Sequence, residues 1–401
     1  MLWKPKLKLT NVLLCILSCG LALCLAEGLM RVAADKLLAE GEFIAVGTVF
    51  KLDDPPMGYG LQPNTSRIVA KGKAFVMKER ISHQGLRDVE HSMEKQSGKQ
   101  RILVLGDSFM YGDGVAMEET MARQLARLTA DFEIINAGVR AYDLGQEYLH
   151  YKHRVRRFQP DLVLLAFFIN DIAPDPTVRA VDGADGLPLF YERKPEVVVR
   201  ERKEAPRGMR GLASSWLRSH SMIYVLLRKR LNDWEVRRRA PRDSKRDNVS
   251  DVFYLEAFRA GPDTAPISKE WSRTYKILDE LKRLVASDGA QLRVMVIPTP
   301  WQTSQEEWTR WVSWLGVEPD SLARLKPQEM VRAWCERSGT PCLDVLQECD
   351  MDERSRIYFR NDSHWTAEGH LQAARCLRPF LTAMAHPRRR FKKCARDFTS
   401  A

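Results

Sequence analysis

The chain has 401 residues, of which 44% are hydrophobic and 29% are charged, and it carries a net charge of +11. This composition excludes a disordered or fibrous protein, and the length suffices for one large globular domain with an anchor or for two modest domains. The charge is local, because residues 193–246 hold 17 Lys or Arg against 6 Asp or Glu.

The N-terminus has the pattern of a membrane anchor. Three lysines lie among the first eight residues, and residues 12–26 that follow carry no charged side chain before Glu27. A basic flank before an apolar run predicts a membrane helix over residues 1–31 with its N-terminus in the cytosol. A signal cleaved after Ala26 and a buried core helix are the alternatives. Either of the first two interpretations places the remaining chain outside the cytosol, on the periplasmic side of the inner membrane if the cell is Gram-negative.

Residues 32–100 form an entry region of mixed character, which we expect to pack on the domain that follows. Residues 101–385 then alternate short apolar runs with helical patterns, a capping box at Asp143 and Gln146 among them. The alternation predicts a doubly wound, three-layer α/β/α sandwich with a mainly parallel five-stranded sheet. The predicted strands are 102–105, 132–135, 162–168, 292–297 and 342–345.

An insertion at about 174–268 interrupts this alternation and contains the basic segment 193–246. Residues Trp216–Trp234 are typical of an amphipathic helix, with Ile223, Leu226, Leu227 and Leu231 on one side. The insertion could be a lid, a membrane-facing element or a partner surface. We expect no nucleic acid as partner because no nucleic-acid motif is present, whereas anionic lipid or acidic polysaccharide fits the charge, as does a solvated face. Residues 386–401 form a second basic stretch, a tail.

Five cysteines lie outside the apolar N-terminal segment, and the sequence leaves their pairing open. They are Cys335, Cys342, Cys349, Cys376 and Cys394. An oxidising compartment permits disulfides among them. Their spacing, and that of the histidines, does not match a zinc site, so we expect neither a metal nor a cofactor.

Four short blocks carry the chemistry that the sequence suggests. Gly106-Asp107-Ser108 ends the first predicted strand, Asn136-Ala137-Gly138 follows the second, and Ile169-Asn170-Asp171 follows the third. The fourth block is Asp362-Ser363-His364-Trp365. In this order the blocks resemble those of the SGNH, or GDSL-like, hydrolase superfamily, over about residues 70–376 without the insertion. The resemblance implies a flavodoxin-like sheet with the site at the carboxyl ends of the strands.

The resemblance also implies a role for each block. Ser108 would be the nucleophile, His364 the general base, and Asp362 its orienting carboxylate. The amides of Ser108 and Gly138 and the side chain of Asn170 would stabilise the oxyanion.

The remaining acids and the simpler interpretations stay open. Asp107 and Asp171 would have a structural role next to the catalytic residues, without contact with the substrate. Simpler roles are a helix cap for Ser108, a loop hydrogen bond for Asn170 and a turn residue for Asp362. The role of Asp362 stays open because the superfamily more often places its aspartate three residues before the histidine, where this chain has Asn361. The block resembles instead the Asp-x-His-Trp variant of bacterial cell-envelope members.

These inferences predict a membrane-anchored, extracytoplasmic serine ester hydrolase. Its substrate would be O-acyl groups, above all O-acetyl groups, of a carbohydrate or other envelope polymer. An O-acetyltransferase that uses the same three residues is the first alternative. A noncatalytic scaffold, which would bind partner proteins of a polymer-assembly complex in the envelope, is the second.

Overall fold

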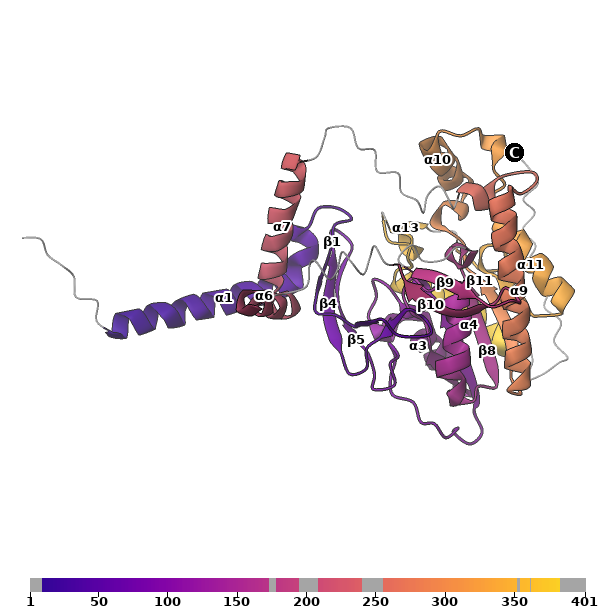
Figure 1. The fold of residues 1–401 in the computed structure, drawn as a ribbon, viewed down its shortest axis with the longest axis horizontal. Coiled ribbons are helices and arrows are strands. Elements are labelled where there is room, and N and C mark those ends of the chain that lie inside the picture. The colour runs from indigo at the N-terminus through magenta and orange to yellow at the C-terminus, as the bar shows by residue number, and fades with distance from the viewer. Residues whose placement is uncertain are drawn as a thin grey trace, which may run out of the picture. The chain divides into compact units, whose positions relative to one another are not determined.

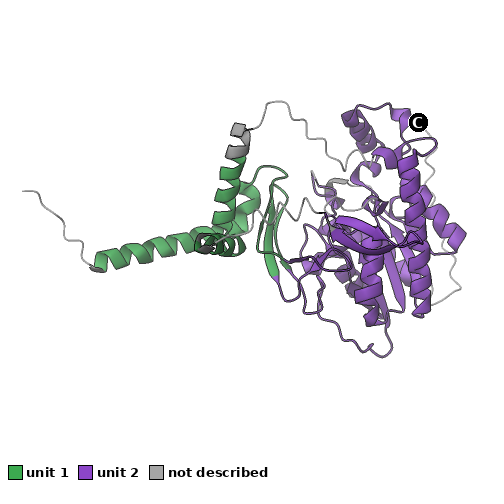
Figure 2. Cartoon of the chain, viewed as in Figure 1, with its two compact units in different colours: residues 1–48, 66–79, 204–244 green, residues 49–65, 80–203, 245–401 purple. Residues whose placement is uncertain are grey.

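The computed structural model describes residues 9–172, 178–194, 208–239, 255–351, 354–360 and 362–382. Contacts within the chain divide it into two compact units (Figure 2). Unit 1 comprises residues 1–48, 66–79 and 204–244, and unit 2 comprises residues 49–65, 80–203 and 245–401. Residues 32–100, expected as one entry region, contribute to both units. The basic tail at 386–401 lies outside the described residues.

A five-stranded parallel sheet forms the centre of unit 2, in the order β12-β11-β8-β6-β7. Val104 on β6 pairs with Leu164 on β8, and Leu165 of β8 pairs with Val294 on β11. All residues of β8 are buried, as expected for a strand covered on both faces. The five predicted strands are therefore confirmed: β6 (Gln100–Gly106), β7 (Phe132–Asn136), β8 (Leu162–Phe167), β11 (Gln291–Val296) and β12 (Cys342–Asp344).

Helices pack on this sheet as predicted for a doubly wound fold (Figure 1). Helix α3 packs against β7 and α14, whereas α4 packs against α9, which also contacts β11. The capping box is confirmed, since the Asp143 carboxylate accepts a hydrogen bond from the Gln146 amide at 2.9 Å. The helices of unit 2 are α2 (Ser108–Tyr111), α3 (Met121–Leu128), α4 (Leu144–His150), α9 (Ala265–Ser287), α10 (Gln305–Leu315), α11 (Lys326–Ser338), α12 (Val345–Glu348), α13 (Arg354–Ile357) and α14 (Ala367–Thr382).

Two hairpins and a disulfide complete the described part of unit 2. The hairpins are β2 (Phe50–Leu52) with β3 (Tyr59–Leu61), and β9 (Val178–Asp182) with β10 (Pro188–Arg193). The Tyr191 hydroxyl on β10 donates to the Asp143 carboxylate at 2.6 Å, so this part of the insertion is fastened to the start of α4. A disulfide joins Cys349 to Cys376.

Unit 1 combines the N-terminal helix, a small sheet and part of the insertion. Its elements are α1 (Leu9–Leu37), β1 (Phe43–Val46), β4 (Ser66–Lys71), β5 (Phe75–Arg80), α6 (Gly208–His220) and α7 (Met222–Arg239). The strands form a sheet in the order β1-β4-β5. The core of the unit is formed by Ala34, Leu38, Ile44, Val46, Ala70, Met222 and Leu226. Within the described chain, α1 is the one helix long and apolar enough to cross a membrane.

The prediction of one continuous helix over Trp216–Trp234 is wrong. The helix breaks at Ser221, whose hydroxyl accepts a hydrogen bond from the Tyr224 amide at 3.2 Å and so begins a new helix, α7. The predicted apolar side is also divided, because Leu226 is buried in the core of unit 1 whereas Leu227 is exposed.

Candidate active site

Ser108 lies at the carboxyl end of β6, where the chain turns sharply into the single helical turn α2. Gly106 at the end of the strand has φ = 159°, and a Cβ there would lie 2.4 Å from Cγ of Met110. The Asp107 carboxylate caps the turn by accepting a hydrogen bond from the Phe109 amide at 2.9 Å. The turn thus presents the Ser108 hydroxyl at the edge where parallel sheets bind ligands.

Asp362 and His364 lie in the loop that precedes α14. Nε2 of His364 is 2.7 Å from Oγ of Ser108, and Nδ1 of the same ring hydrogen-bonds Oδ1 of Asp362. The Asp362 carboxylate also accepts a hydrogen bond from the His364 backbone amide at 2.9 Å. A carboxylate at Nδ1 favours the tautomer with the proton on that nitrogen, which leaves Nε2 free to accept a proton from Ser108. The structure therefore brings these three predicted residues together.

Aromatic packing holds the histidine loop against the serine turn. The Phe109 ring lies 5.3 Å from the His364 ring and 5.0 Å from the fully buried Trp365 ring, measured between centroids. On the other side of the loop, the Phe359 amide donates to the His364 carbonyl at 3.0 Å. Trp365 thus packs against Phe109, the same ring that contacts the imidazole of His364.

A second carboxylate faces the imidazole. Oδ2 of Asp113 lies 3.8 Å from Nε2 of His364, and Nε of Arg140 donates to Oδ1 of Asp113 at 2.8 Å. Burial opposes the charged imidazole, but the hydrogen bond to Asp362 and the charges of Asp113, Asp362 and Asp107 outweigh it and raise the pKa of His364. Our sequence interpretation missed Asp113 and Arg140; the Gly-Asp-Gly sequence at 112–114 indicates a turn but not that Asp113 lies near His364.

Gly138 follows β7 and packs closely behind the serine turn. A Cβ at this position would lie 2.4 Å from the Tyr111 amide nitrogen, which explains the need for glycine. The Gly138 amide donates to Oδ1 of Asn136 at 3.1 Å, and Nδ2 of Asn136 donates to the Met110 carbonyl at 2.7 Å. The predicted oxyanion donor is therefore engaged within the protein, in contrast to the Ser108 amide, which donates no hydrogen bond among the described residues.

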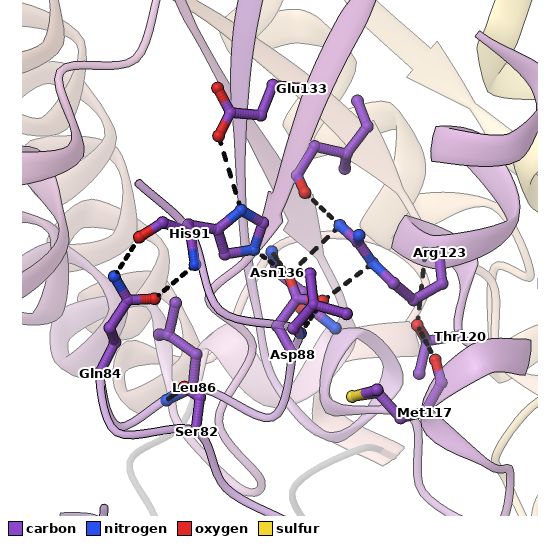
Figure 3. A network of polar contacts seen from close by, with 12 residues as sticks. Ser82, Gln84, Leu86, Asp88, His91, Met117, Thr120, Arg123, Glu133 and Asn136 are labelled. Atoms are coloured by element: carbon purple, nitrogen blue, oxygen red, sulfur yellow. Dashed lines mark hydrogen bonds and ion pairs between the residues drawn. The ribbon is translucent and has the colours of Figure 1, made fainter. Parts of the chain in front are cut away.

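A buried ionic network anchors the end of β7 (Figure 3). The Asp88 carboxylate accepts the Asn136 backbone amide at 2.7 Å and pairs with Nε of Arg123 at 2.8 Å. Nε2 of His91 lies 2.9 Å from the same carboxylate. The network fixes Asn136 and, through it, Gly138. The sequence near Asp88 did not indicate this role, because two of its partners, Arg123 and Asn136, are distant along the chain.

Asn170 lies in the short 3₁₀ turn Ile169–Ile172, directly after β8. Its side-chain amide donates to the Tyr142 carbonyl at 3.3 Å and also hydrogen-bonds Asp107. Its Oδ1 is buried and has no hydrogen-bond partner among the described residues. The side chain thus links the third block to the residue that precedes Ser108.

Several carboxyl groups are buried behind the serine turn. Burial raises the pKa of Asp107 to about 6, although its hydrogen bond with the Phe109 amide opposes this shift. Burial and neighbouring acids raise the pKa of Glu147 and of Asp171 well above ordinary values. The Phe168 amide donates to Oδ2 of Asp171 at 2.8 Å. Burial thus disfavours the charged forms of Glu147 and Asp171, whereas Asp113, Asp362 and Asp107 are the carboxylates whose charge acts on His364.

A parallel-sheet α/β domain that joins a serine, a histidine and an aspartate in this way has the side-chain arrangement of a serine hydrolase. A model of the GDSL-like lipase/acylhydrolase family matches residues 104–372, which is more than half of the chain. The chain belongs to this family. The resemblance inferred from the four sequence blocks is thereby confirmed.

Solved structures similar to this chain include a lipolytic protein, a lipase and an esterase. A lipolytic protein of the G-D-S-L family from Desulfitobacterium hafniense DCB-2 is 10% identical, with 70% of this chain and 98% of that chain covered and a TM-score of 0.35. A GDSL-like lipase from Bacteroides thetaiotaomicron VPI-5482 is 10% identical, with 73% of this chain and 93% of that chain covered and a TM-score of 0.36. An acetyl xylan esterase, AlAXEase, is 11% identical, with 69% of this chain and 97% of that chain covered and a TM-score of 0.37. No curated protein sequence matches this chain.

Proposed function

We propose that the protein is a membrane-anchored, extracytoplasmic serine ester hydrolase that removes O-acyl groups, above all O-acetyl groups, from a carbohydrate or other envelope polymer. The observation that carries the catalytic part is the 2.7 Å contact between Oγ of Ser108 and Nε2 of His364, with Asp362 on the opposite ring nitrogen. A hydroxyl in this setting can lose its proton to the imidazole as it attacks an ester carbonyl.

The proposed reaction has two halves. Oγ of Ser108 attacks the acyl carbon while Nε2 of His364 takes the hydroxyl proton, and the resulting imidazolium is stabilised by Asp362. The imidazolium then protonates the leaving alcohol oxygen, the ester bond breaks, and the acyl group remains on Ser108. In the second half, His364 takes a proton from water and the hydroxide adds to the acyl carbon. The bond between this carbon and Oγ of Ser108 then breaks, the acyl group leaves as a carboxylic acid, and the imidazolium returns its proton to Oγ.

The developing oxyanion would be stabilised by amide donors beside Ser108. The Ser108 backbone amide is the first of these, and Gly138 and Asn170 are the other two that we propose. The Asn170 side chain has two N–H groups, of which one donates to the Tyr142 carbonyl. The Gly138 amide donates its single N–H to Asn136 and must exchange this acceptor for the substrate oxygen. This exchange would accompany substrate binding.

The proposed location rests on the N-terminal helix and the disulfide. Helix α1 is long and apolar enough to span a bilayer, and three lysines precede it in the sequence. The bond between Cys349 and Cys376 in unit 2 fits an oxidising compartment outside the cytosol. An envelope polymer is proposed as substrate because of this location and because the Asp-Ser-His-Trp block at 362–365 resembles that of cell-envelope members.

The test is esterase activity of the full-length chain in detergent. We expect hydrolysis of p-nitrophenyl acetate, and a loss of about 10⁴-fold or more in kcat for Ser108→Ala. Ser313→Ala, which alters an exposed serine of α10, should retain full activity, and both variants should unfold at nearly the wild-type temperature. Equal rates for Ser108→Ala and the wild type would refute the proposal. Mass spectrometry of an added polysaccharide acceptor would separate hydrolysis from acyl transfer.

A further inference from the structure

Glu27 marks the position on α1 at which contacts with the rest of unit 1 begin. The apolar part of α1 before it is exposed; Leu17 and Leu21, for example, are exposed at 69% and 64%. From Leu9 to Glu27 the helix rises about 27 Å, at 1.5 Å per residue. Since the hydrocarbon core of a bilayer is about 30 Å thick, a spanning α1 places Glu27 at the membrane surface.

The junction between α6 and α7 is bound to this same residue. The Glu27 carboxylate accepts hydrogen bonds from the Met222 amide at 2.7 Å and from the Ser221 hydroxyl at 2.9 Å. One turn later on α1, Arg31 donates to the His220 carbonyl at the end of α6. A membrane that contains α1 therefore has its surface at the level of the α6–α7 junction.

Both helices carry large apolar side chains that are exposed, although each helix packs on the small sheet. Each helix contacts β1, and α7 buries Met222 and Leu226 in the core that contains residues of that strand. The exposed apolar side chains are Met209, Leu212 and Trp216 on α6, and Leu227 and Leu231 on α7, each exposed at 60–86%. Their spacing of three or four residues places them on one face of each helix.

The order of elements within unit 1 directs these faces toward the lipid. Along the axis of α1, α6 and α7 lie between the free apolar part of α1 and the strands β1 and β4 (Figure 2). With the strands on one side of the two helices, their exposed side faces the apolar part of α1. The same stretch is basic, since residues 208–233 contain five Lys or Arg and one Asp, and two of the five, Lys229 and Arg230, form ion pairs with Glu42.

We propose that α6 and α7 form a membrane-surface platform (residues 208–233) that rests on an anionic phospholipid bilayer. The platform would insert its exposed apolar side chains at the boundary between headgroups and acyl chains, while basic residues such as Arg218 and Arg228 meet the phosphates. Trp216, near the junction, suits the interfacial position that indole rings prefer. This inference rests on the proposed membrane anchorage by α1. It assigns to part of the basic insertion a lipid surface as its partner.

The experiment uses the full-length chain in vesicles of phosphatidylcholine and phosphatidylglycerol. Every cysteine except Cys349 and Cys376 is replaced by alanine, and an environment-sensitive dye is attached to a single cysteine introduced at Leu212 or Leu227. A phospholipid with a nitroxide at the headgroup serves as quencher. The matched control is Lys36→Cys, because Lys36 is exposed on α1 itself, nine residues beyond Glu27 and so about 14 Å farther from the bilayer.

We expect the dyes at 212 and 227 to be quenched several-fold more strongly than the dye at 36. Their quenching should decrease when phosphatidylglycerol is omitted, and quenching independent of this lipid would overturn the charge part of the proposal. A dye on Cys19 alone reports the anchor. If Cys19 is shielded from water but 212 and 227 are quenched no more than 36, the platform is refuted and the anchor stands. If Cys19 is exposed to water, both fail.

Discussion

The two sides of the candidate active site differ in how ready they are for chemistry. On the proton-transfer side, Ser108 and His364 are already in contact and Asp362 holds the imidazole. On the proposed oxyanion side, the Gly138 amide donates its single N–H to Asn136, and the Asn170 side chain donates one of its two N–H groups to the Tyr142 carbonyl. The difference indicates that proton transfer is organised before substrate arrives, whereas the proposed Gly138 donor has to exchange its protein acceptor for the substrate.

Asp362→Asn should have the largest effect among the variants that keep the nucleophile and the base. The side-chain amide of the introduced asparagine would no longer favour the tautomer with the proton on Nδ1. Nε2 would then carry a proton itself and could not accept one from Ser108. We expect kcat for p-nitrophenyl acetate to fall about 10⁴-fold with little change in KM. A variant with more than a tenth of wild-type kcat would show that Asp362 is only a turn residue.

Asn170→Ala tests the oxyanion side and should have an intermediate effect. Removal of one donor to the oxyanion costs about 10²–10³-fold in kcat. If the side chain served only the Tyr142 carbonyl and Asp107, the variant would lower the temperature of thermal unfolding and leave kcat of the folded enzyme near the wild-type value. Measurement of both quantities on the same preparation separates the two roles.

Asp113→Asn should produce the smallest change, a shift of the pH profile. In the proposed mechanism the base is neutral His364, and the raised pKa of that group means that kcat/KM should be lost on acidification at a pH above the ordinary histidine value of about 6.5. Removal of the Asp113 charge should lower the pKa of His364 and move this acid limb to lower pH. Asp320→Asn, which alters an exposed carboxylate far along the sequence, is the control. If the acid side of the kcat/KM profile were the same in Asp113→Asn and the wild type, Asp113 would not raise the pKa of His364.

What could be read from the sequence depended on whether the signal was local. Runs such as Leu162–Phe167 predict buried strands because both faces are apolar, and Gly106-Asp107-Ser108 predicts the turn that follows β6. The break at Ser221 escaped prediction because Glu27, almost two hundred residues away, helps to cap the new helix. Asp113 escaped because its relevance depends on its distance from Nε2 of His364, which only the folded chain defines.

The capping of α7 by Glu27 bears on how the protein could be shed from a membrane. A cut just before Glu27 would leave the carboxylate, Arg31 and the core residues Ala34 and Leu38 in place, so we expect unit 1 to survive release. A cut five residues later would remove Glu27, whose cap of α7 is worth about 1 kcal/mol. It would also remove Arg31, which donates to the His220 carbonyl. A cut that keeps all of these contacts therefore has to precede Glu27.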